Sequence, residues 1–296
     1  MNLADYCPVF FLCLQSLVIK IAGLTRYSKE PPLSSKPEFR LTKWYADCVA
    51  ENGDTVVLYH GVARWHGIAV HYSNLLRLFP SGRPCAGYSL RKCAPPRVLG
   101  GVMEWESHAL KAKGSWERID APFHTIVYES EAGAVEWHCL QPRSRAAVQL
   151  GDGTSIHGLG YAERLEMSLP PWKMPIRELR WGRFLSKTDS LVWMDWRGPY
   201  SKQIILHNGE TQGEAEVGAR KISIGEEMLL KLADGDVLRS GRLGTTALAM
   251  IPGVDKVLPG RILKVEECKW RGRAELRRRN SISTGWAIHE VVRWPE

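Results

Sequence analysis

The sequence lacks the short motifs that mark common nucleotide and nucleophile sites. Its glycine-rich residues 151–156 (GDGTSI) contain no lysine and precede no helical pattern, so they do not resemble a phosphate-binding loop. There is no G-x-S-x-G segment to present a nucleophilic serine, and no nicotinamide or flavin fingerprint. These absences argue against P-loop NTPases, α/β-hydrolases and dinucleotide-dependent enzymes. We expect no cofactor.

Cysteine and histidine are present without the spacing of a metal site. The seven cysteines are odd in number, and no two form a Cys-x-x-Cys pair. Among the nine histidines, His66 and His71 stand five residues apart, which does not fit the i, i+4 pair of a helical zinc site. We therefore expect free thiols, no bound metal and a reducing, cytoplasmic setting.

Long apolar runs are missing except near the N-terminus. Residues 8–24 are mainly apolar but are interrupted by Gln15, Ser16 and Lys20, so the run is marginal for a membrane-spanning helix. It has neither the positive leading region nor the cleavage site of a secretory signal. We expect residues 1–36 to be either a leader outside the folded domain or a segment that contacts a membrane surface.

Positive charge is in excess, with a net charge of +8 and an isoelectric point near 9.1. Much of the excess lies in residues 269–279, a basic run that belongs to no recognisable nucleic-acid module. The run also lacks the interleaved aromatic residues that stack single-stranded bases. We expect no nucleic-acid partner and interpret the run as a solvated strand or turn.

The chain is rich in strand and turn patterns. Asn52-Gly53, a strong hairpin turn, separates the apolar residues 44–50 and 55–60. Residues 123–139 predict a second hairpin, and residues 227–240 another. Apart from the leader, only residues 71–78 suggest a helix. The fold class is therefore expected to be all-β and mainly antiparallel.

A weak internal echo predicts two related halves. The segment Trp44-Tyr-Ala-Asp47 resembles Trp193-Met-Asp195, and each is followed by an apolar strand that ends in histidine. We expect an N-terminal β domain over residues 37–155 and a C-terminal β domain over residues 156–296.

Several segments between residues 40 and 296 carry a family resemblance. They are Lys43-Trp44-Tyr45-Ala-Asp47, Gly158-x-Gly-Tyr161-x-Glu163, Pro171-Trp172-x-x-Pro175, Leu179-x-Trp181-Gly-Arg183-Phe184 and Gly285-Trp286-Ala-Ile-His289-Glu290. Together they resemble the hydroxyneurosporene synthase (carotenoid 1,2-hydratase) superfamily, which includes tocopherol-cyclase-like and other two-lipocalin proteins. The resemblance implies two lipocalin-like antiparallel β-barrels packed together around an apolar pocket for an isoprenoid- or polyketide-like ligand. It also implies hydration, cyclisation or rearrangement of hydrophobic alkenes. The residues after Tyr161 lack the histidine of the hydratase pattern, which argues against carotenoid hydration itself.

Acidic residues among aromatic ones suggest acid–base chemistry on an apolar substrate. A carboxylic acid kept protonated by a dry site can deliver a proton to a double bond. The catalytic candidates are Glu163, Asp195 and Asp47. Strand alternation places Asp195 on the same face as Trp193, which favours a pocket position. The structural alternatives are ion pairs, of Glu163 with Arg183 or Arg164 and of Asp195 with Arg197.

The expected substrate-binding residues are Tyr45, Tyr161, Trp172, Trp181, Arg183, Trp193 and His289. Two functions on the same fold follow from these residues. The first is a cofactor-independent hydratase, cyclase or isomerase that acts on a bulky hydrophobic substrate. The second is a carrier that binds a lipid or pigment without turning it over. A third interpretation, a scaffold at a membrane surface, depends on residues 1–36 and the basic run.

Overall fold

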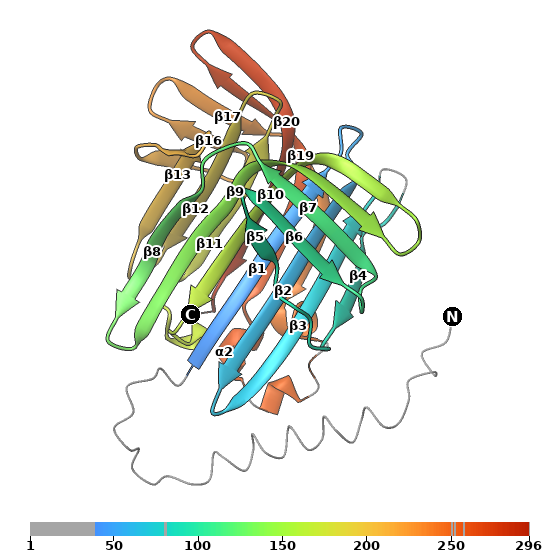
Figure 1. The fold of residues 1–296 in the computed structure, drawn as a ribbon. Coiled ribbons are helices and arrows are strands. Elements are labelled where there is room, and N and C mark those ends of the chain that lie inside the picture. Colours follow the sequence, from blue (N-terminus) through green and yellow to red (C-terminus); the bar gives the residue numbers. More distant parts are fainter. Residues whose placement is uncertain (1–38, 80–81, 250, 252, 257, 296) are drawn as a thin grey trace.

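Two large antiparallel sheets make up the protein (Figure 1). The computed structural model describes residues 39–296 except 80–81, 250, 252, 257 and 296, so the expected leader lies outside the described residues. The first sheet contains β1 (Phe39–Val49), β2 (Thr55–Trp65), β3 (Ile68–Leu78), β4 (Cys85–Ser89), β5 (Arg97–Leu99), β6 (Val102–Ser107), β7 (Ala112–Arg118), β8 (Phe123–Ser130), β9 (Gly133–Leu150) and β10 (Ser155–Met167).

The second sheet follows after a short 3-10 turn, η1 (Pro171–Lys173). It contains β11 (Glu178–Leu185), β12 (Ser190–Arg197), β13 (Lys202–His207), β14 (Glu210–Thr211), β15 (Ala215–Val217), β16 (Lys221–Ile224), β17 (Met228–Leu232), β18 (Asp236–Arg242), β19 (Glu266–Arg278) and β20 (Ser281–Arg293). Between β18 and β19 lie η2 (Leu243–Thr245), η3 (Val254–Lys256) and the short helix α2 (Gly260–Leu263). Within the described part of the chain, no helix has the length and apolar character needed to cross a membrane.

The two sheets have the same topology. The strand order is β4-β3-β2-β1-β10-β9-β7-β6-β5 in the first and β14-β13-β12-β11-β20-β19-β17-β16-β15 in the second, with β8 on β9 and β18 on β19. Each strand of the second sheet thus matches the strand ten places earlier. The all-β fold of two lipocalin-like halves is confirmed. The sheet changes between Met167 and Glu178, whereas the expected domain division lay near residue 155.

The register aligns the halves residue by residue. β1 and β10 pair Val49 with Leu159 and Tyr45 with Glu163. β11 and β20 pair Leu185 with Trp286 and Trp181 with Glu290. Val49 and Leu185 end their strands, so Tyr45 corresponds to Trp181, and Glu163 corresponds to Glu290. The sequence echo was therefore wrong by one strand, because residues 44–47 of β1 match residues 180–183 of β11 and not β12.

Two glycines support this alignment. A Cβ added to Gly158 in β10 would lie 2.0 Å from the carbonyl oxygen of Val49, and one added to Gly285 in β20 would lie 2.0 Å from that of Leu185. Both contacts are far shorter than any real Cβ contact, so each half needs a glycine where its last strand crosses the end of its first.

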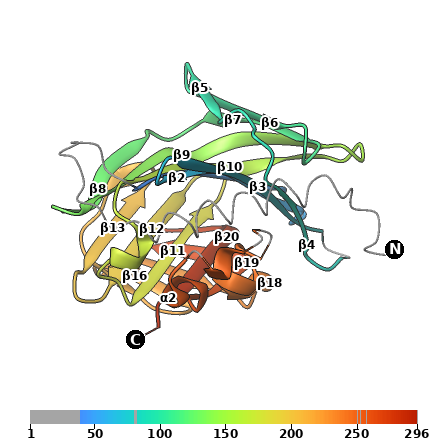
Figure 2. The same ribbon diagram turned by 90° about the horizontal axis from the view of Figure 1, so that it is seen from below.

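The halves pack face to face (Figure 2). A large hydrophobic cluster between them takes residues from both sheets, such as Tyr45, Trp137, Trp181 and Trp196. Each sheet also has a cluster of its own on the opposite face. Because side chains alternate along a strand, each central strand contributes to two clusters. The space between the sheets is therefore where residues of both halves meet.

The structure corrects two local expectations. Residues 71–78 belong to β3 and form no helix. Leu75 packs into the first sheet's own cluster, and Leu76 and Leu78 pack between the sheets, so a strand buried on both faces produced a continuous apolar run. In residues 227–240, β17 and β18 each pair with β19 and do not form the expected hairpin. The predicted hairpins β1–β2 and β8–β9 are confirmed.

Candidate functional site

Aromatic rings from both sheets surround the carboxyl group of Glu163. The ring of Tyr45 in β1 lies 5.1 Å from that of Trp181 in β11 and 5.9 Å from that of Tyr161 in β10, measured between centroids. Tyr161 and Trp181 lie 5.5 Å apart. All three rings are buried. Tyr45, Tyr161 and Trp181, which were expected to bind substrate, thus lie together and next to Glu163.

Glu163 receives three hydrogen bonds on one oxygen. Its Oε2 accepts from Trp137 Nε1 at 2.6 Å, from the Tyr161 hydroxyl at 2.7 Å and from Trp181 Nε1 at 3.2 Å. Tyr161 reaches it because residues i and i+2 of a strand share a face. Among the described residues, no hydrogen bond reaches Oε1. The expected alternatives, pairing with Arg164 or Arg183, are not formed, since these arginines pair with Glu166 and Asp47.

Burial sets the protonation of Glu163. Loss of solvation raises the pKa of this carboxyl above its ordinary value, and this outweighs the opposing effects of the Tyr161 hydrogen bond and the charge of Lys43. The residue as a whole is partly buried. Glu163 therefore combines a raised pKa with an oxygen, Oε1, that accepts no hydrogen bond from the described residues.

The corresponding carboxyl of the second half, Glu290, behaves in the opposite way. Its Oε2 lies 2.5 Å from Nζ of Lys269, whose side chain is 1% exposed. Burial alone would raise the pKa of Glu290, but the charges of Lys269 and Lys43 outweigh burial and hold the pKa below its ordinary value. Glu290 is thus held as a carboxylate.

One difference between the halves accounts for this contrast. On the neighbouring strand, Glu290 is paired in register with Lys269, whereas Glu163 is paired with Cys139, whose thiol is fully buried. Burial raises the pKa of Cys139 well above its ordinary value, so the thiol stays neutral. The pKa values of two carboxyls in matching positions are therefore shifted in opposite directions. Environments that push two acids apart in this way provide one acid and one base.

The ammonium group of Lys269 occupies the aromatic faces of the site. Its Nζ lies 4.7 Å from the ring centroid of Trp181 and 5.1 Å from that of Tyr45. A cation over a ring face is favourable, and more so when it is desolvated. Since the same indole donates its N–H to Glu163, Trp181 connects the acid Glu163 to the Lys269–Glu290 pair.

Asp47 and Arg183 form a fully buried ion pair between the sheets. Arg183 Nη2 donates to Asp47 Oδ1 at 2.8 Å and Nε donates to Oδ2 at 3.1 Å, while Nη1 donates to the carbonyl of Trp286 at 2.7 Å. The Tyr45 hydroxyl also donates to Asp47, at 2.9 Å. With these bonds Asp47 is saturated, which favours a structural role over catalysis.

Three other candidates lie on the far face of the second sheet. Trp193 belongs to the cluster on that face, whereas its neighbours Met194 and Trp196 point between the sheets. Asp195 therefore lies away from Glu163. It forms an ion pair with Arg197 at 2.5 Å, which is the structural role given above as the alternative to catalysis. His289 stacks on Trp270 with centroids 5.1 Å apart, and burial lowers its pKa to about 4.

Trp172, in η1, lies within the cluster between the sheets but contacts different rings. Its centroid lies 4.9 Å from that of Trp65 and 5.8 Å from that of Phe39. These residues begin β1 and end β2, so Trp172 covers one end of the space between the sheets.

Sequence reasoning missed Trp137, Lys269 and Glu290. Trp137 was assigned only to a hairpin, and Lys269 to a solvated basic run. The expectation of a solvated run is wrong at the start of the run, because Lys269 and Arg271 are both buried. The period-two spacing of Lys269, Arg271 and Arg273 was the signal for a shared face. The sequence analysis chose His289 as a substrate-binding residue and passed over its neighbour Glu290. Adjacent residues of a strand point to opposite faces, and it is Glu290 that points between the sheets.

The two carboxyls predict opposite dependences of stability on pH. Between the ordinary pKa of 4.5 and the raised value, folded Glu163 holds more protons than the unfolded chain, so rising pH lowers stability. We expect the free energy of unfolding of wild type, relative to Glu163→Gln, to fall as pH rises above 4.5. Urea denaturation between about pH 4 and 8 measures this.

Glu290→Gln is the matched control for this prediction. Glu290 has a lowered pKa, so its contribution is present above the ordinary value of 4.5 and is lost as pH falls through the folded value. The advantage of wild type over Glu290→Gln should therefore shrink on acidification. Equal pH profiles for the two variants would contradict the opposite pKa shifts of the two carboxyls.

Comparisons with known proteins establish the fold. No family model and no curated protein matches the sequence. Among solved structures, a protein of Nitrosomonas europaea provisionally named AttH is similar, with 12% identity, a TM-score of 0.53, and coverage of 90% of this chain and 97% of that protein. CghA is similar at 11% identity, a TM-score of 0.50, and coverage of 87% and 88%. CghA with Sch210972 gives the same identity and TM-score, with coverage of 90% and 94%.

These identities are low, so they concern the fold and leave the activity open. The similar structures extend over most of this chain and share its fold.

Proposed function

We propose that the protein is a cofactor-independent acid–base enzyme that hydrates, cyclises or isomerises a bulky hydrophobic substrate between its two sheets. Glu163 is the proton donor. The observation that carries this proposal is the carboxyl itself, which has a raised pKa, three donors on Oε2 and an unbonded Oε1. The three hydrogen bonds fix the carboxyl in one orientation, so Oε1 is the oxygen that delivers the proton.

The position of Lys269 favours a substrate that carries a carbonyl group. A carbocation would be stabilised by the faces of Tyr45 and Trp181, but the ammonium of Lys269 already lies over both. A buried ammonium instead stabilises negative charge that develops on an oxygen. We therefore propose an apolar substrate, isoprenoid- or polyketide-like, in which the reacting double bond is conjugated to a carbonyl.

Hydration illustrates how the residues would divide the work. The carbonyl oxygen of the enone binds Lys269, and the Glu290 carboxylate takes a proton from water as the hydroxyl forms a bond to the β-carbon. Glu163 Oε1 gives its proton to the α-carbon, and the carbonyl is restored. One proton has then moved from Glu163 to Glu290, and exchange with solvent returns both to their starting states. Cyclisation or isomerisation would use the same donor without the added water.

The fold supports small-molecule binding, since CghA was captured with the compound Sch210972. The rival proposal is a carrier that binds an apolar ligand in the same place without turning it over. Solvent deuterium separates the two. β-Ionone, a bulky isoprenoid enone, and a panel of related ketones are incubated with the protein in D2O and analysed by mass spectrometry. The enzyme gives a hydrated, cyclised or isomerised product, or carbon-bound deuterium, whereas a carrier gives unchanged ligand that co-elutes with the protein.

A further inference from the structure

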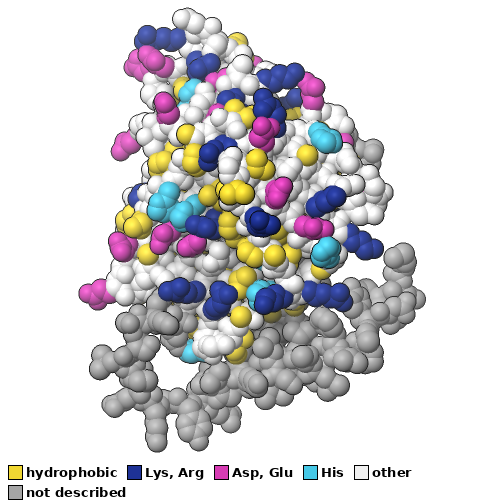
Figure 3. Space-filling model, viewed as in Figure 1, with side chains coloured by type: hydrophobic (Ala, Val, Ile, Leu, Met, Phe, Trp, Pro, Cys, Tyr) yellow, Lys and Arg dark blue, Asp and Glu magenta, His cyan; other side chains and the backbone are white. Residues whose placement is uncertain are grey.

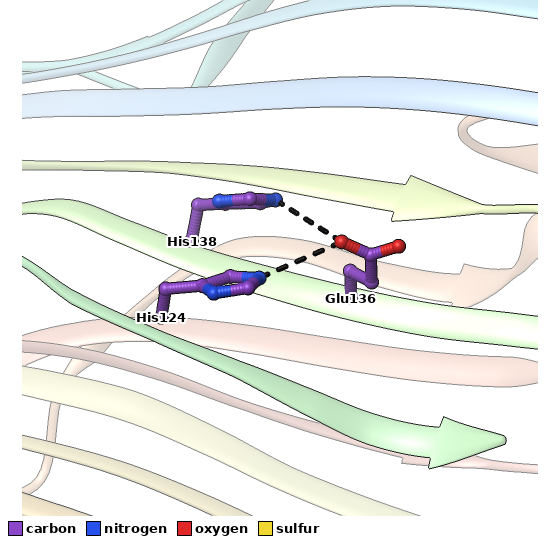
Figure 4. A group of neighbouring side chains, drawn as sticks. All are labelled: His124, Glu136 and His138. Atoms are coloured by element: carbon purple, nitrogen blue, oxygen red, sulfur yellow. Dashed lines mark ion pairs between the residues drawn. The ribbon is translucent and has the colours of Figure 1, made fainter.

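Three potential metal ligands lie together on the β8–β9 hairpin, on the face turned away from the second sheet. His124 in β8 pairs in register with His138 in β9, and Glu136 stands two residues before His138 on the same face. Trp137 and Cys139, which alternate with them, point into the cluster between the sheets. Figure 3 shows histidine and acidic side chains side by side over this hairpin, and Figure 4 shows both imidazoles directed at the carboxylate.

The spacing of the three ligand atoms suits a small cation. Nε2 of His124 lies 3.5 Å and Nε2 of His138 lies 3.8 Å from Oε2 of Glu136. Ligands bound tetrahedrally to zinc at about 2.1 Å are separated by about 3.4 Å. All three potential ligand atoms lie within 4.8 Å of one another, so shifts of a few tenths of an ångström at the carboxylate complete two edges of the polyhedron.

We propose that His124, Glu136 and His138 form a binding site for a divalent transition-metal ion, with zinc as the preferred ion. Two imidazoles and one carboxylate are a ligand set that zinc accepts. Calcium and magnesium prefer oxygen ligands, whereas two of these three ligand atoms are nitrogen. The side chains of His124 and Glu136 are 52% and 40% exposed, and that of His138 is 17% exposed. A metal held by these three ligands has one coordination position open to solvent.

An unsatisfied nitrogen provides independent support. Nε2 of His138 is buried and has no hydrogen-bond partner. A buried polar atom without a partner is costly, and a metal ion would satisfy it. Arg164, a fixed positive charge opposite His138 on β10, is paired with Glu166 at 2.9 Å, which offsets its repulsion.

Binding requires a small rearrangement of the rings. His124 and His138 are stacked with centroids 4.2 Å apart and planes 21° from parallel, and an imidazole donates to a metal in its own plane. The rings must therefore splay. His124 is the exposed partner and can rotate about its side-chain bonds without moving the strand. The metal would then clamp β8 to β9 on the side opposite Trp137.

The sequence did not predict this site because its ligands are not periodic along one strand. His124 is fourteen residues from His138, and only the hairpin register brings them together. We expected no metal because we considered only the spacing of potential ligands within one segment.

Titration of the chelator-treated full-length protein with zinc chloride tests the proposal. Isothermal titration calorimetry should show one saturable site whose affinity falls by more than about tenfold in His138→Ala and in His124→Ala, since even an outer partner of a metal ligand has an effect of that size. His108→Ala is the matched control, because His108 Nδ1 lies 3.5 Å from Glu106 but lacks a second histidine. It should bind zinc as wild type does.

Cobalt(II) substitution gives a second readout, because a tetrahedral site produces intense visible absorption that the His138→Ala variant should lose. Far-UV circular dichroism checks that the variants fold, and the His124 variant changes a side chain that is 52% exposed. The proposal is overturned if wild type shows no saturable zinc binding. It is equally overturned if both histidine variants bind as wild type does, or if His108→Ala weakens binding as much as they do.

Discussion

Replacing Arg183 by methionine is expected to lower the free energy of unfolding by about 3–5 kcal/mol, because the Asp47 carboxylate would be left buried without its partner. The pair is fully buried and joins corresponding positions of the two halves. Urea denaturation at neutral pH measures the loss. The double variant Asp47→Leu/Arg183→Met should recover much of the stability that Arg183→Met loses, because an apolar pair of similar volume replaces both charges.

A surface pair offers a matched control. Lys187 and Glu51 follow β11 and β1, join the same two halves at 3.1 Å and are each 86% exposed. Lys187→Met should change the free energy of unfolding by less than about 1 kcal/mol. If Arg183→Met were no more destabilising than Lys187→Met, the buried pair could not be a main connection between the sheets.

The Glu163→Gln variant is expected to lose about 10²–10⁴-fold in turnover of any substrate found in the deuterium assay, because an amide cannot deliver the proton. Ligand affinity should change little, since the amide keeps an acceptor for the donors at Oε2. In wild type, turnover should decline as pH rises through the raised pKa of Glu163, because only the protonated carboxyl acts. Turnover and binding are measured on the same preparation.

Asp195→Asn separates the structure from the sequence-based expectation of a second acid at position 195. Asp195 is buried on the far face of the second sheet, so its amide should leave turnover nearly unchanged at temperatures where the variant is folded. Equal losses in Glu163→Gln and Asp195→Asn would contradict the site described here. Full turnover in Glu163→Gln would remove the proton donor from the proposal.

The sequence predicted those features that depend on a single segment. Asn52-Gly53 specified its hairpin because the backbone of that turn needs glycine, with a φ of 96° at Gly53. Glu163 was selected because the aromatic residues Tyr161 and Trp172 lie near it in the sequence. Alternation also placed Asp195 with Trp193 correctly, yet it could not say which face of the strand meets the other half. That choice depends on how both sheets curl, which is a tertiary property.

The remaining site residues depend on contacts between distant segments. In the sequence, Lys269 is one of several positive charges in a basic run. Only the register of β19 with β20 shows that Glu290 is its partner. Trp137 reaches Glu163 across β9 and β10, although its hairpin pattern alone suggested a structural strand. In each case the evidence for the site residue is its neighbour on the adjacent strand, and the spacing of residues within one segment does not reveal that neighbour.

The matched positions of Glu163 and Glu290 have a consequence for how such a site can arise. In a dimer of two identical subunits, a residue and its twin across the axis experience the same surroundings, so two such carboxyls would have one common intrinsic affinity for protons. Joining the halves in one polypeptide removes that constraint, because each can then change alone. Here Glu163 is paired in register with Cys139 and Glu290 with Lys269, and the pKa values of the two carboxyls are shifted in opposite directions. The covalent link between the halves is thus what allows two matching carboxyls to have different affinities for protons.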